Sequence, residues 1–524
     1  MRQSIRLVVN TATLLSRMVI TFGIGLYITR LLLDLLGASD FGLLSALGAS
    51  GTLLLLVTPA LNAGAIRNMA YELGRADARR ASEVFNATLV LFLGMGLLLL
   101  GIGLVAAQPL LEGLTIPPER EQAAAAVLYL TLANLVVTTI SAPWRGAIEA
   151  RQAMGQVAAG EVIRTLLNLA CVGLILVVEG DPLVVYAAGL LAATVLRALG
   201  TAVIGAVRFP EIRMRPGDIR LAEIRRLASF TGWTTLIRVG APLHAQAAVV
   251  LIGMAFSPVV TAAYGVAMRL RGYHSHFTKV LPRVVHPAMT SKEASGNRGY
   301  VQDLAFMTSK YSSVGALFFV VPLTIEMDGI LGLWLREVPP GTAEFARITF
   351  LWMTIQVLAS GVDQAIFAQG AVRGYGLLTL GVWISSIAIS AFWFFGLGLG
   401  PMSLPWTYVG ATVVHLGVTL FVGAERVGLS ASRWWRETLV AVVAPAFPGS
   451  LAALAVHAAL PEGGVRILAV TAAYALVAAP FSWWWSIGPK EKRALSRGFE
   501  RRGRKLVGAA PRSAPGESPQ APQA

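Results

Sequence analysis

Long apolar runs separated by short polar connections recur from one end of the chain to the other. Each run has about 20 residues, which lets a helix cross a hydrocarbon core about 30 Å thick. The pattern therefore predicts an all-α polytopic membrane protein with about fourteen spans, or twelve without the two weakest, the fifth and the thirteenth. The predicted spans lie near residues 12–33, 41–66, 85–107, 122–143, 161–178, 183–207, 229–253, 257–281, 308–328, 345–367, 373–394, 402–424, 438–459 and 464–487.

Composition supports this class and excludes others. Of 524 residues, 55% are hydrophobic and only 14% are charged. The single cysteine, Cys171, excludes an internal disulfide and a cysteine-built metal site. No phosphate-cradling glycine-rich loop is present, so we expect no ATP hydrolysis. The formal net charge of +15 would favour a nucleic-acid partner in a soluble chain, but here the basic residues gather in the connections and we expect no nucleic acid.

The basic connections predict how the chain is oriented. Those after the second and sixth spans are rich in arginine, and those after the eighth and twelfth spans are also basic. The connections between them carry Glu112, Glu119 and Glu121, or almost no charge. Because Lys and Arg accumulate on cytoplasmic loops, both termini are expected in the cytoplasm, with the chain in the cytoplasmic (inner) membrane.

The end of the chain predicts contact with the membrane surface. The stretch "SWWWSIGPKEKR" places three tryptophans at the end of the last span, where aromatic side chains anchor a helix in the headgroup region. Residues 490–505 are rich in Lys and Arg, which favours binding to anionic membrane lipids. The remaining residues have a composition typical of disorder.

A weak internal repeat predicts two lobes. Both "TLLSRMVITFGIGLYI" and "TTLIRVGAPLHAQAAVVLIG" place an arginine early in a span, Arg17 in the first and Arg238 in the seventh. Six spans separate the copies, so both halves enter from the same side, as a parallel pseudo-twofold repeat does. We predict an N-lobe of six helices at 1–225 and a C-lobe of six at 226–430. Two additional spans at 431–488 and a basic, then disordered, cytoplasmic tail at 489–524 would follow.

Cations inside the predicted spans are the candidate binding groups. A charged side chain near the bilayer centre costs roughly 2.5–3.5 kcal/mol on insertion scales. Arg269 is near the middle of the eighth span, and His276 and Lys279 fall on its helical face, with Arg271 on a neighbouring one. Each arginine could instead snorkel to the surface or bond across helices. Several cations together favour a hydrated positive cavity for an anionic passenger, such as a phosphate-bearing lipid headgroup.

One carboxylate in the second half is a candidate for ion coupling. The tenth predicted span places Gln356, Asp363 and Gln364 on one helical face. Asp363 is the candidate group for proton or sodium coupling, with pairing to an arginine as the alternative. We expect no bound cofactor. His274 and His276 are two residues apart and do not share a helix face, so no metal site is expected either.

The first third of the chain resembles a known family. The pieces that carry the resemblance are Leu36-Gly37, Asp40-Phe41-Gly42, Arg67, and Glu72-Leu73-Gly74 with the basic stretch after it, and "AAYGVAMRL" in the second half matches more loosely. They resemble the polysaccharide-exporting branch, the Wzx-type flippases of lipid-linked oligosaccharides, in the multidrug/oligosaccharidyl-lipid/polysaccharide exporter superfamily. The resemblance implies two six-helix lobes around a central cavity, alternating access, and an undecaprenyl-diphosphate-linked sugar as the passenger.

The resemblance and the cations together predict a flippase and no enzyme. It would move a polyprenyl-diphosphate-linked oligosaccharide from the inner to the outer leaflet for surface polysaccharide biosynthesis, with the diphosphate on Arg17, Arg238 and Arg269. Its further expected partners are a polysaccharide polymerase and glycosyltransferases.

Three alternatives stay open. Lipid II flippases share the extra pair of spans, but their arginine- and asparagine-rich signature after the first span is absent here. A multidrug cation antiporter would need carboxylates at mid-depth in spans one to six, and the predicted spans have none there. A membrane polymerase or glycosyltransferase would need a larger external loop than the connection near 328–344, which has no Asp-x-Asp pair.

Overall fold

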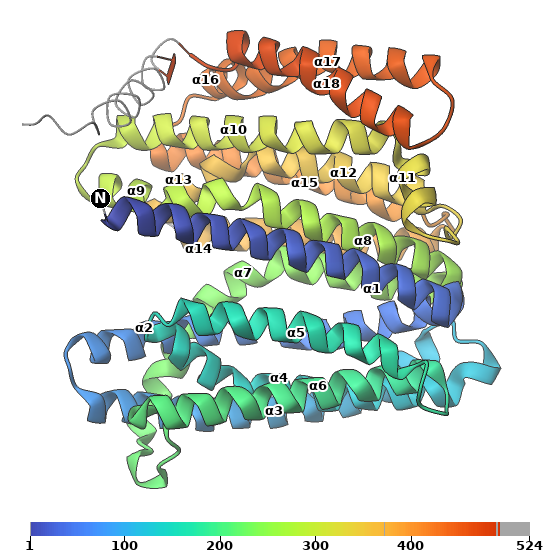
Figure 1. Ribbon diagram of the computed structural model, residues 1–524. Coiled ribbons are helices and arrows are strands. Elements are labelled where there is room, and N and C mark those ends of the chain that lie inside the picture. The colour runs from blue at the N-terminus through green and yellow to red at the C-terminus, as the bar shows by residue number, and fades with distance from the viewer. Residues whose placement is uncertain (1, 371, 489–490, 493–524) are drawn as a thin grey trace, which may run out of the picture.

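The computed structural model describes residues 2–370, 372–488 and 491–492, and it describes their side chains except at residues 2–20, 60, 210, 228–238 and 372. Within these ranges the regular structure is helical and no strand occurs. Figure 1 shows long helices running roughly side by side in stacked layers. The predicted all-α fold is confirmed.

The first long helix contains a reversal that the hydrophobic pattern places between spans one and two. Helix α1 (Arg2–Leu55) is interrupted at Gly37, whose φ of 75° and ψ of 170° are not helical. Glycine reaches a positive φ without the steric cost that a Cβ imposes. Residues 2–36 and 38–55 are therefore two helices, and α2 (Thr58–Gly74) completes the second predicted span.

The other helices follow the remaining predicted spans in chain order. They are α3 (Ala78–Gly113), α4 (Glu121–Ala150), α5 (Met154–Leu174), α6 (Pro182–Arg208), α7 (Leu221–Ala255), α8 (Pro258–Thr278), α9 (Val280–Ala294), α10 (Arg298–Ile325), α11 (Met327–Trp334), α12 (Thr342–Leu358), α13 (Ser360–Gln369), α14 (Val372–Ala391), α15 (Ser403–Val422), α16 (Ala431–Trp434), α17 (Ala441–Ala459) and α18 (Gly464–Trp485).

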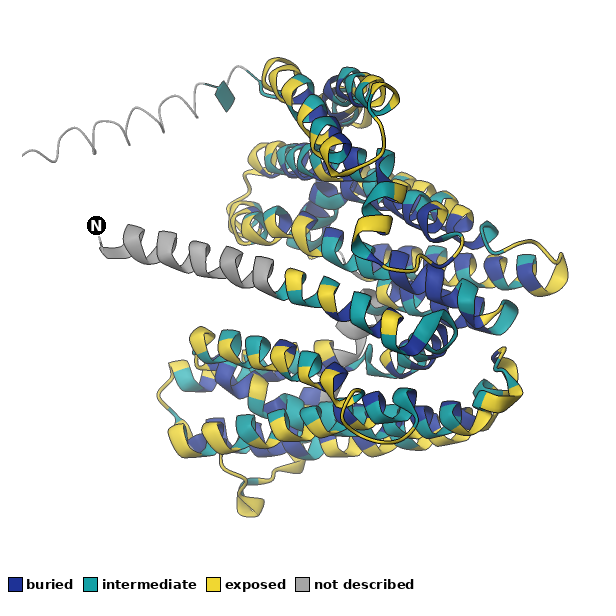
Figure 2. Ribbon diagram, turned by 45° about the vertical axis from the view of Figure 1, so that its right-hand side comes forward, coloured by how far each residue is buried: buried dark blue, intermediate teal, exposed yellow. Residues whose placement is uncertain are grey.

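Length and hydropathy support a membrane fold. Among the described residues, ten helices are long and apolar enough to cross a bilayer, or eleven if α12 and α13, bent by 43°, form one span. Large apolar side chains remain exposed on them, such as Val105 at 80% and Leu196 at 61%. Figure 2 shows exposed residues along the outer sides of the helices. In a bilayer such surfaces contact lipid.

The two ends of the helix bundle differ in charge. We call one end the basic face, because it holds the arginine-rich connections after α2 and α6, and the other the opposite face, which holds Gly37 and the connections after α3 and α5. In Figure 1 the basic face is at the left, where α1 starts.

Two helices join the predicted lobes. The first half of α1 lies along α8, while α7 packs against α14 on one side and against α2 and α3 on the other. The helices α2 to α6 form one stack and α8 to α15 the other (Figure 1). The exact domain limits of 225 and 430 stay a prediction.

The lobes meet tightly at the opposite face. A Cβ on Gly42 would lie 1.8 Å from the carbonyl oxygen of Pro258, at the start of α8. The amide of Thr115, after α3, donates to the carbonyl of Gly253 near the end of α7 at 2.9 Å. Arg336, after α11, pairs with Asp34 of α1 at 3.2 Å. We call this set the opposite-face contact.

An arginine orders the N-lobe at the same end. Arg120 forms an ion pair with Asp40 and a 2.6 Å pair with Asp181, the residue that caps α6. Burial raises the pKa of Asp181, but hydrogen bonds from Arg120 and from the amides of Val184 and Leu183 outweigh it, so the pKa lies below its usual value. These ion pairs hold the break in α1, the start of α4 and the start of α6 together.

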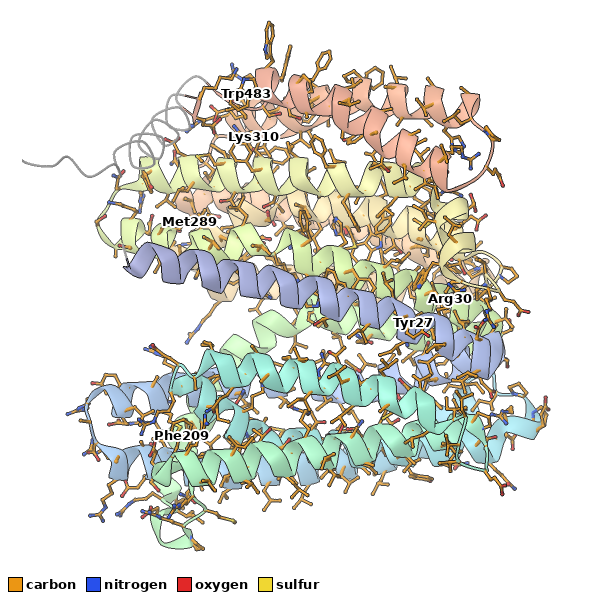
Figure 3. All side chains as sticks on the ribbon, viewed as in Figure 1. Tyr27, Arg30, Phe209, Met289, Lys310 and Trp483 are labelled. Atoms are coloured by element: carbon orange, nitrogen blue, oxygen red, sulfur yellow. The ribbon has the colours of Figure 1, made fainter. Side chains whose placement is uncertain are left out.

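The two additional helices are bound to α10 at both faces. At the opposite face, Glu326 is fully buried and contacts His457 of α17 at 2.7 Å and Arg466 of α18 at 3.1 Å. Toward the basic face, Lys310 of α10 pairs with Glu491 at 3.0 Å. Figure 3 shows Lys310 below the end of α18, where Trp483 lies. The extra pair is thus an integral part of the C-terminal stack.

Candidate functional site

Arg269 lies where α8 meets α1. Its guanidinium donates to the hydroxyl of Thr29 at 3.2 Å and lies 5.0 Å from the ring centre of Phe41. Thr29 and Phe41 are fully buried, and each belongs to one half of α1. No carboxylate of the described residues forms an ion pair with Arg269. The cation is therefore held at the junction of the lobes without a counter-ion.

Arg271 faces away from this junction. Its guanidinium carbon lies 4.9 Å from the ring centre of Trp352, inside the C-terminal stack. Its Nε is buried and has no hydrogen-bond partner among the described residues. The two arginines, predicted as one cluster, thus serve different environments: Arg269 faces α1 and Arg271 faces α12.

His276 and Lys279 are exposed at the basic-face end of α8. The ring of His276 lies 6.1 Å from that of Phe22 in α1. Because α8 ends at Thr278, Lys279 is its C-cap and the predicted stripe does not continue as one helix. Arg269, His276 and Lys279 still lie in order from the lobe junction toward the basic face. Of the three, Arg269 and His276 lie beside α1, at Thr29 and Phe22.

The other two predicted phosphate ligands fall outside the described side chains. Arg17 lies in the first half of α1, and Arg238 lies in α7. Both helices are those that join the lobes, but nothing is assigned to the two side chains, and their role stays a prediction.

Asp363 is bonded to hydroxyl groups. Its carboxylate accepts a hydrogen bond from Tyr375 and lies 3.4 Å from the hydroxyl of Thr419, which is 2.9 Å from that of Tyr375. The alternative that Asp363 pairs with an arginine finds no ion pair among the described residues. Tyr375 also lines a cavity of about 360 Å³ with Glu425 and Arg426 at the basic face. The carboxylate therefore lies one side chain away from a cavity.

The predicted face of the tenth span is broken. The helix bends by 43° between α12, which carries Gln356, and α13, which carries Asp363 and Gln364. Gln356 therefore lies on a different helix axis from Asp363 and Gln364, and the three do not share one straight helical face. Within the described residues no group of three or more His, Cys, Asp or Glu side chains could hold a metal ion.

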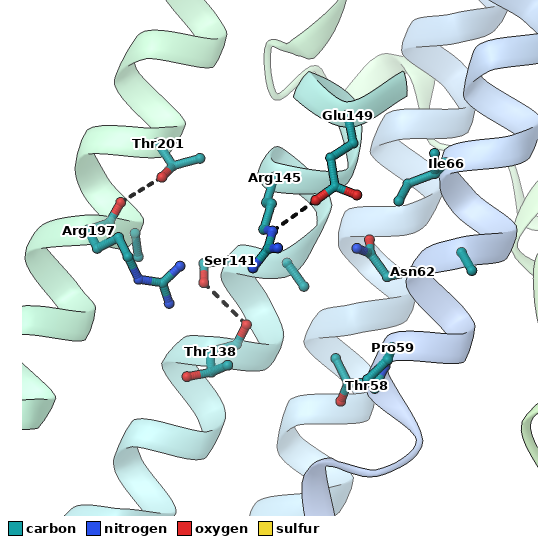
Figure 4. A pocket seen from close by; sticks show the side chains of 13 residues that line it. Thr58, Pro59, Asn62, Ile66, Thr138, Ser141, Arg145, Glu149, Arg197 and Thr201 are labelled. Carbon is teal, nitrogen blue, oxygen red and sulfur yellow. Dashed lines mark hydrogen bonds and ion pairs between the residues drawn. The ribbon is translucent and has the colours of Figure 1, made fainter. Parts of the chain in front are cut away.

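A polar cavity in the N-lobe was missed by the sequence reasoning. It has a volume of about 460 Å³ and lies between α2, α4 and α6. Figure 4 shows Arg145 of α4 and Arg197 of α6 pointing into the space between their helices, with Asn62 of α2 on the far side of Arg145. Arg197 is 15 residues into an apolar helix, so the cost argument applied to Arg269 would have found it.

The sequence and the fold were compared with those of known proteins. The sequence model of the family described as "Polysaccharide biosynthesis protein" matches residues 7–292. No curated protein sequence matched the chain.

Solved structures share the fold at low sequence identity. "Lipid II flippase MurJ, inward closed conformation" has a TM-score of 0.69 and 13% identity, covering 89% of this chain and 97% of that one. "Inward-facing conformation of a multidrug resistance MATE family transporter of the MOP superfamily" has a TM-score of 0.57 and 15% identity, covering 78% and 98%. "Crystal structure of MATE in complex with MaL6" has a TM-score of 0.53 and 16% identity, covering 79% of this chain and 95% of that one.

Proposed function

The chain belongs to the polysaccharide biosynthesis protein family and has the fold of the multidrug/oligosaccharidyl-lipid/polysaccharide exporter superfamily, and on this premise we propose that it is a flippase of a lipid-linked oligosaccharide. The passenger is a polyprenyl-diphosphate-linked glycan that crosses from the inner to the outer leaflet of the cytoplasmic membrane. Glycosyltransferases assemble the glycan before this step, and a polysaccharide polymerase acts after it. The chain itself carries out no chemical step.

Arg269 is the observation that carries this proposal. A half-buried guanidinium without a carboxylate partner is costly inside a membrane, and an anionic passenger offsets that cost. Arginine presents a planar fork of donors that matches phosphate oxygens. A diphosphate that follows Lys279 and His276 along α8 reaches Arg269 at the lobe junction. Arg17 and Arg238 complete the seat from α1 and α7.

The orientation follows from charge. With the basic face in the cytoplasm, both termini are cytoplasmic and the opposite-face contact closes the outer side. The passenger then enters from the inner leaflet, and separation of the lobes at the opposite face releases it outward. A membrane potential that is negative inside favours outward movement of an anion by about 2.3 kcal/mol per charge per 100 mV.

The Arg269→Ala variant tests the proposal. A hydrogen bond to a charged group contributes about 1.5–3 kcal/mol, so we expect translocation to slow roughly tenfold or more. The measurement is flipping of a polyprenyl-diphosphate-linked glycan in liposomes containing the purified full chain. Arg298→Ala, at an arginine whose side chain is 63% exposed, is the control and should flip as the native chain does. Equal rates for Arg269→Ala and the native chain would refute the proposed seat.

Asp363 is the coupling group in this scheme. Uptake and release of a proton or sodium ion there, through the cavity that Tyr375 lines, links the C-lobe to the ion gradient. Asp363→Asn keeps an oxygen that accepts from Tyr375 but removes the charge. We expect it to remove the stimulation of flipping by an imposed proton or sodium gradient. Asp303→Asn, at a carboxylate that is 56% exposed, should keep it. Full stimulation in both variants would exclude Asp363 as the coupling group.

Lipid II is the second candidate passenger. The structural match to the lipid II flippase covers 89% of this chain, whereas the MATE transporters cover 78% to 79%. Offering lipid II and another polyprenyl-diphosphate glycan to the same liposomes separates the two.

A cationic drug is disfavoured by the N-lobe cavity. The carboxylate that lines it, Glu149, is already paired with Arg145 at 2.9 Å, which leaves no free negative charge there for a cation.

A further inference from the structure

The polar cavity of the N-lobe meets a second, largely apolar one. The second cavity has a volume of about 480 Å³ and lies between α4, α5 and α6. Both cavities are lined by Arg145, Arg197 and Thr201. Each volume falls within the ~300–1,000 Å³ that is typical of small-molecule sites. The two cavities are therefore compartments of one space with two arginines at their boundary.

The apolar compartment is a groove that opens to the bilayer. Near the opposite face α5 and α6 pack closely, because a Cβ on Gly189 would lie 3.1 Å from Leu174 and 3.4 Å from Cys171. Toward the basic face the two helices instead line the groove with aliphatic side chains. Ile163, Leu196 and Ile204 are 50%, 61% and 49% exposed there. An exposed aliphatic groove at this depth suits a hydrocarbon chain.

The polar compartment offers unused hydrogen-bonding atoms. The Oγ1 of Thr58 and the Oδ1 of Asn62, both on α2, are buried and have no partner among the described residues. Ser141 and Thr138 of α4 line the same compartment, as Figure 4 shows. Buried polar atoms without partners are costly, so they indicate a polar ligand or bound water.

The boundary carries an excess of positive charge. Arg145 pairs with Glu149 and Glu161, and Arg164 pairs with Glu161, each at 2.9 Å. Arg197 is within electrostatic reach of Glu161 but forms no hydrogen bond or ion pair through its guanidinium within the described structure. Three arginines thus face two carboxylates. Arg197 lies 11 residues before the end of α6, roughly 16 Å inside the helix end, where snorkelling is difficult.

We infer that this space binds a phosphate-bearing lipid, with its polar head in the α2 compartment, its phosphate on Arg145 and Arg197, and its chain in the groove between α5 and α6. The order polar, cationic, apolar along the space matches the order head, phosphate, hydrocarbon along such a lipid. The ligand is either the lipid-linked glycan, in which case this site precedes Arg269 and rests on the proposed function, or an anionic phospholipid of the bilayer. The two sources share the phosphate chemistry that the arginines recognise.

Photo-crosslinking of the purified full chain tests this site. The probes carry a photoreactive group in the hydrocarbon chain and are a polyprenyl phosphate, a phosphatidylglycerol, and a polyprenol that lacks the phosphate. Crosslinks to α5 and α6 are expected from at least one phosphate probe, at roughly tenfold the yield of the polyprenol. Crosslinking by polyprenyl phosphate alone identifies the passenger lipid, and crosslinking by phosphatidylglycerol identifies a bilayer lipid. Equal labelling by the polyprenol overturns the inference.

Two variants separate phosphate recognition from folding. Arg145→Gln with Arg197→Gln should reduce the phosphate-dependent yield about tenfold, whereas Arg298→Gln should leave it unchanged. Leu196→Trp fills the groove and should reduce labelling even where the arginines are intact. Unchanged labelling of α5 and α6 in both test variants contradicts the site.

The outcome is independent of the proposed flippase activity. Arg269→Ala should keep this labelling while it slows flipping. If the native chain is labelled at α5 and α6 but does not flip the glycan, the proposed function is rejected and the site stands. If the native chain flips the glycan but shows no phosphate-dependent labelling there, the site alone is rejected.

Discussion

Replacing Gly42 with alanine is expected to abolish transport. The added Cβ would lie 1.8 Å from the carbonyl oxygen and 2.6 Å from the carbonyl carbon of Pro258, and 3.1 Å from the amide of Ala262. These are backbone atoms at the start of α8, so no side-chain rotation relieves the overlap. In the Gly42→Ala variant the overlap forces the lobes apart at the opposite-face contact. A transporter that cannot close there cannot complete its cycle.

Gly48→Ala is the matched control for this prediction. Gly48 lies in the same helical half of α1, but a Cβ there meets nothing within 4 Å. Both variants gain helix propensity, by up to about 1 kcal/mol, so a weaker helix cannot explain a loss. Transport is measured in liposomes, and closure by thiol labelling of a cysteine introduced at Ser45 in a Cys171→Ser background. Wild-type transport by Gly42→Ala would show that this contact is not part of the cycle.

Removing the carboxylate of Glu326 is expected to cost the most stability. Glu326 is fully buried and accepts from Arg466, whose side chain is only 9% exposed, and it contacts His457. Breaking a buried ion pair from one side costs about 3–5 kcal/mol, because the remaining charge is left unpaired. Glu326→Ala should therefore lower the unfolding temperature and release α17 and α18 from α10.

Thermal unfolding in detergent and protease cleavage between α17 and α18 measure this effect. Glu425→Ala removes a 55% exposed carboxylate that is paired with Arg426 at 3.6 Å, and should cost less than about 1 kcal/mol. Glu326→Leu combined with Arg466→Leu removes both charges and should be more stable than Glu326→Ala alone. If Glu326→Ala unfolds like Glu425→Ala, the buried pair does not hold the extra helices.

The length of the apolar runs was enough to place the helices. A span must hydrogen-bond its own backbone N–H and C=O groups inside a bilayer, and a helix is one of the few structures that does so. Run length also placed the break at Gly37, between the first two predicted spans, but not the bend between α12 and α13, which interrupts the single predicted span 345–367. A bend of this kind depends on what the neighbouring helices permit, and that information is not contained in the local pattern.

Helix periodicity separated the arginines correctly but could not choose between their surroundings. It placed Arg269 and Arg271 on neighbouring faces of α8. Whether either face meets a cavity, α1 or the interior of the C-terminal stack depends on packing between distant segments, such as Thr29 or Trp352. The same limit explains why the role of Arg145 in the N-lobe site was missed, although the depth of Arg197 in its helix was a usable signal. Arg145 and Glu149 are four residues apart and resemble a surface pair, whereas the pairing of Arg145 with Glu161 joins two helices.

The crossed packing of α1 and α7 has a mechanical consequence. The first half of α1 packs against α8 of the second lobe, and α7 packs against α2 and α3 of the first. Between separate subunits, such an exchange of equivalent elements would be called a domain swap. Within one chain it ties each half to the other by a whole helix. The halves can then rock about that shared pair, but they cannot drift apart when either end opens.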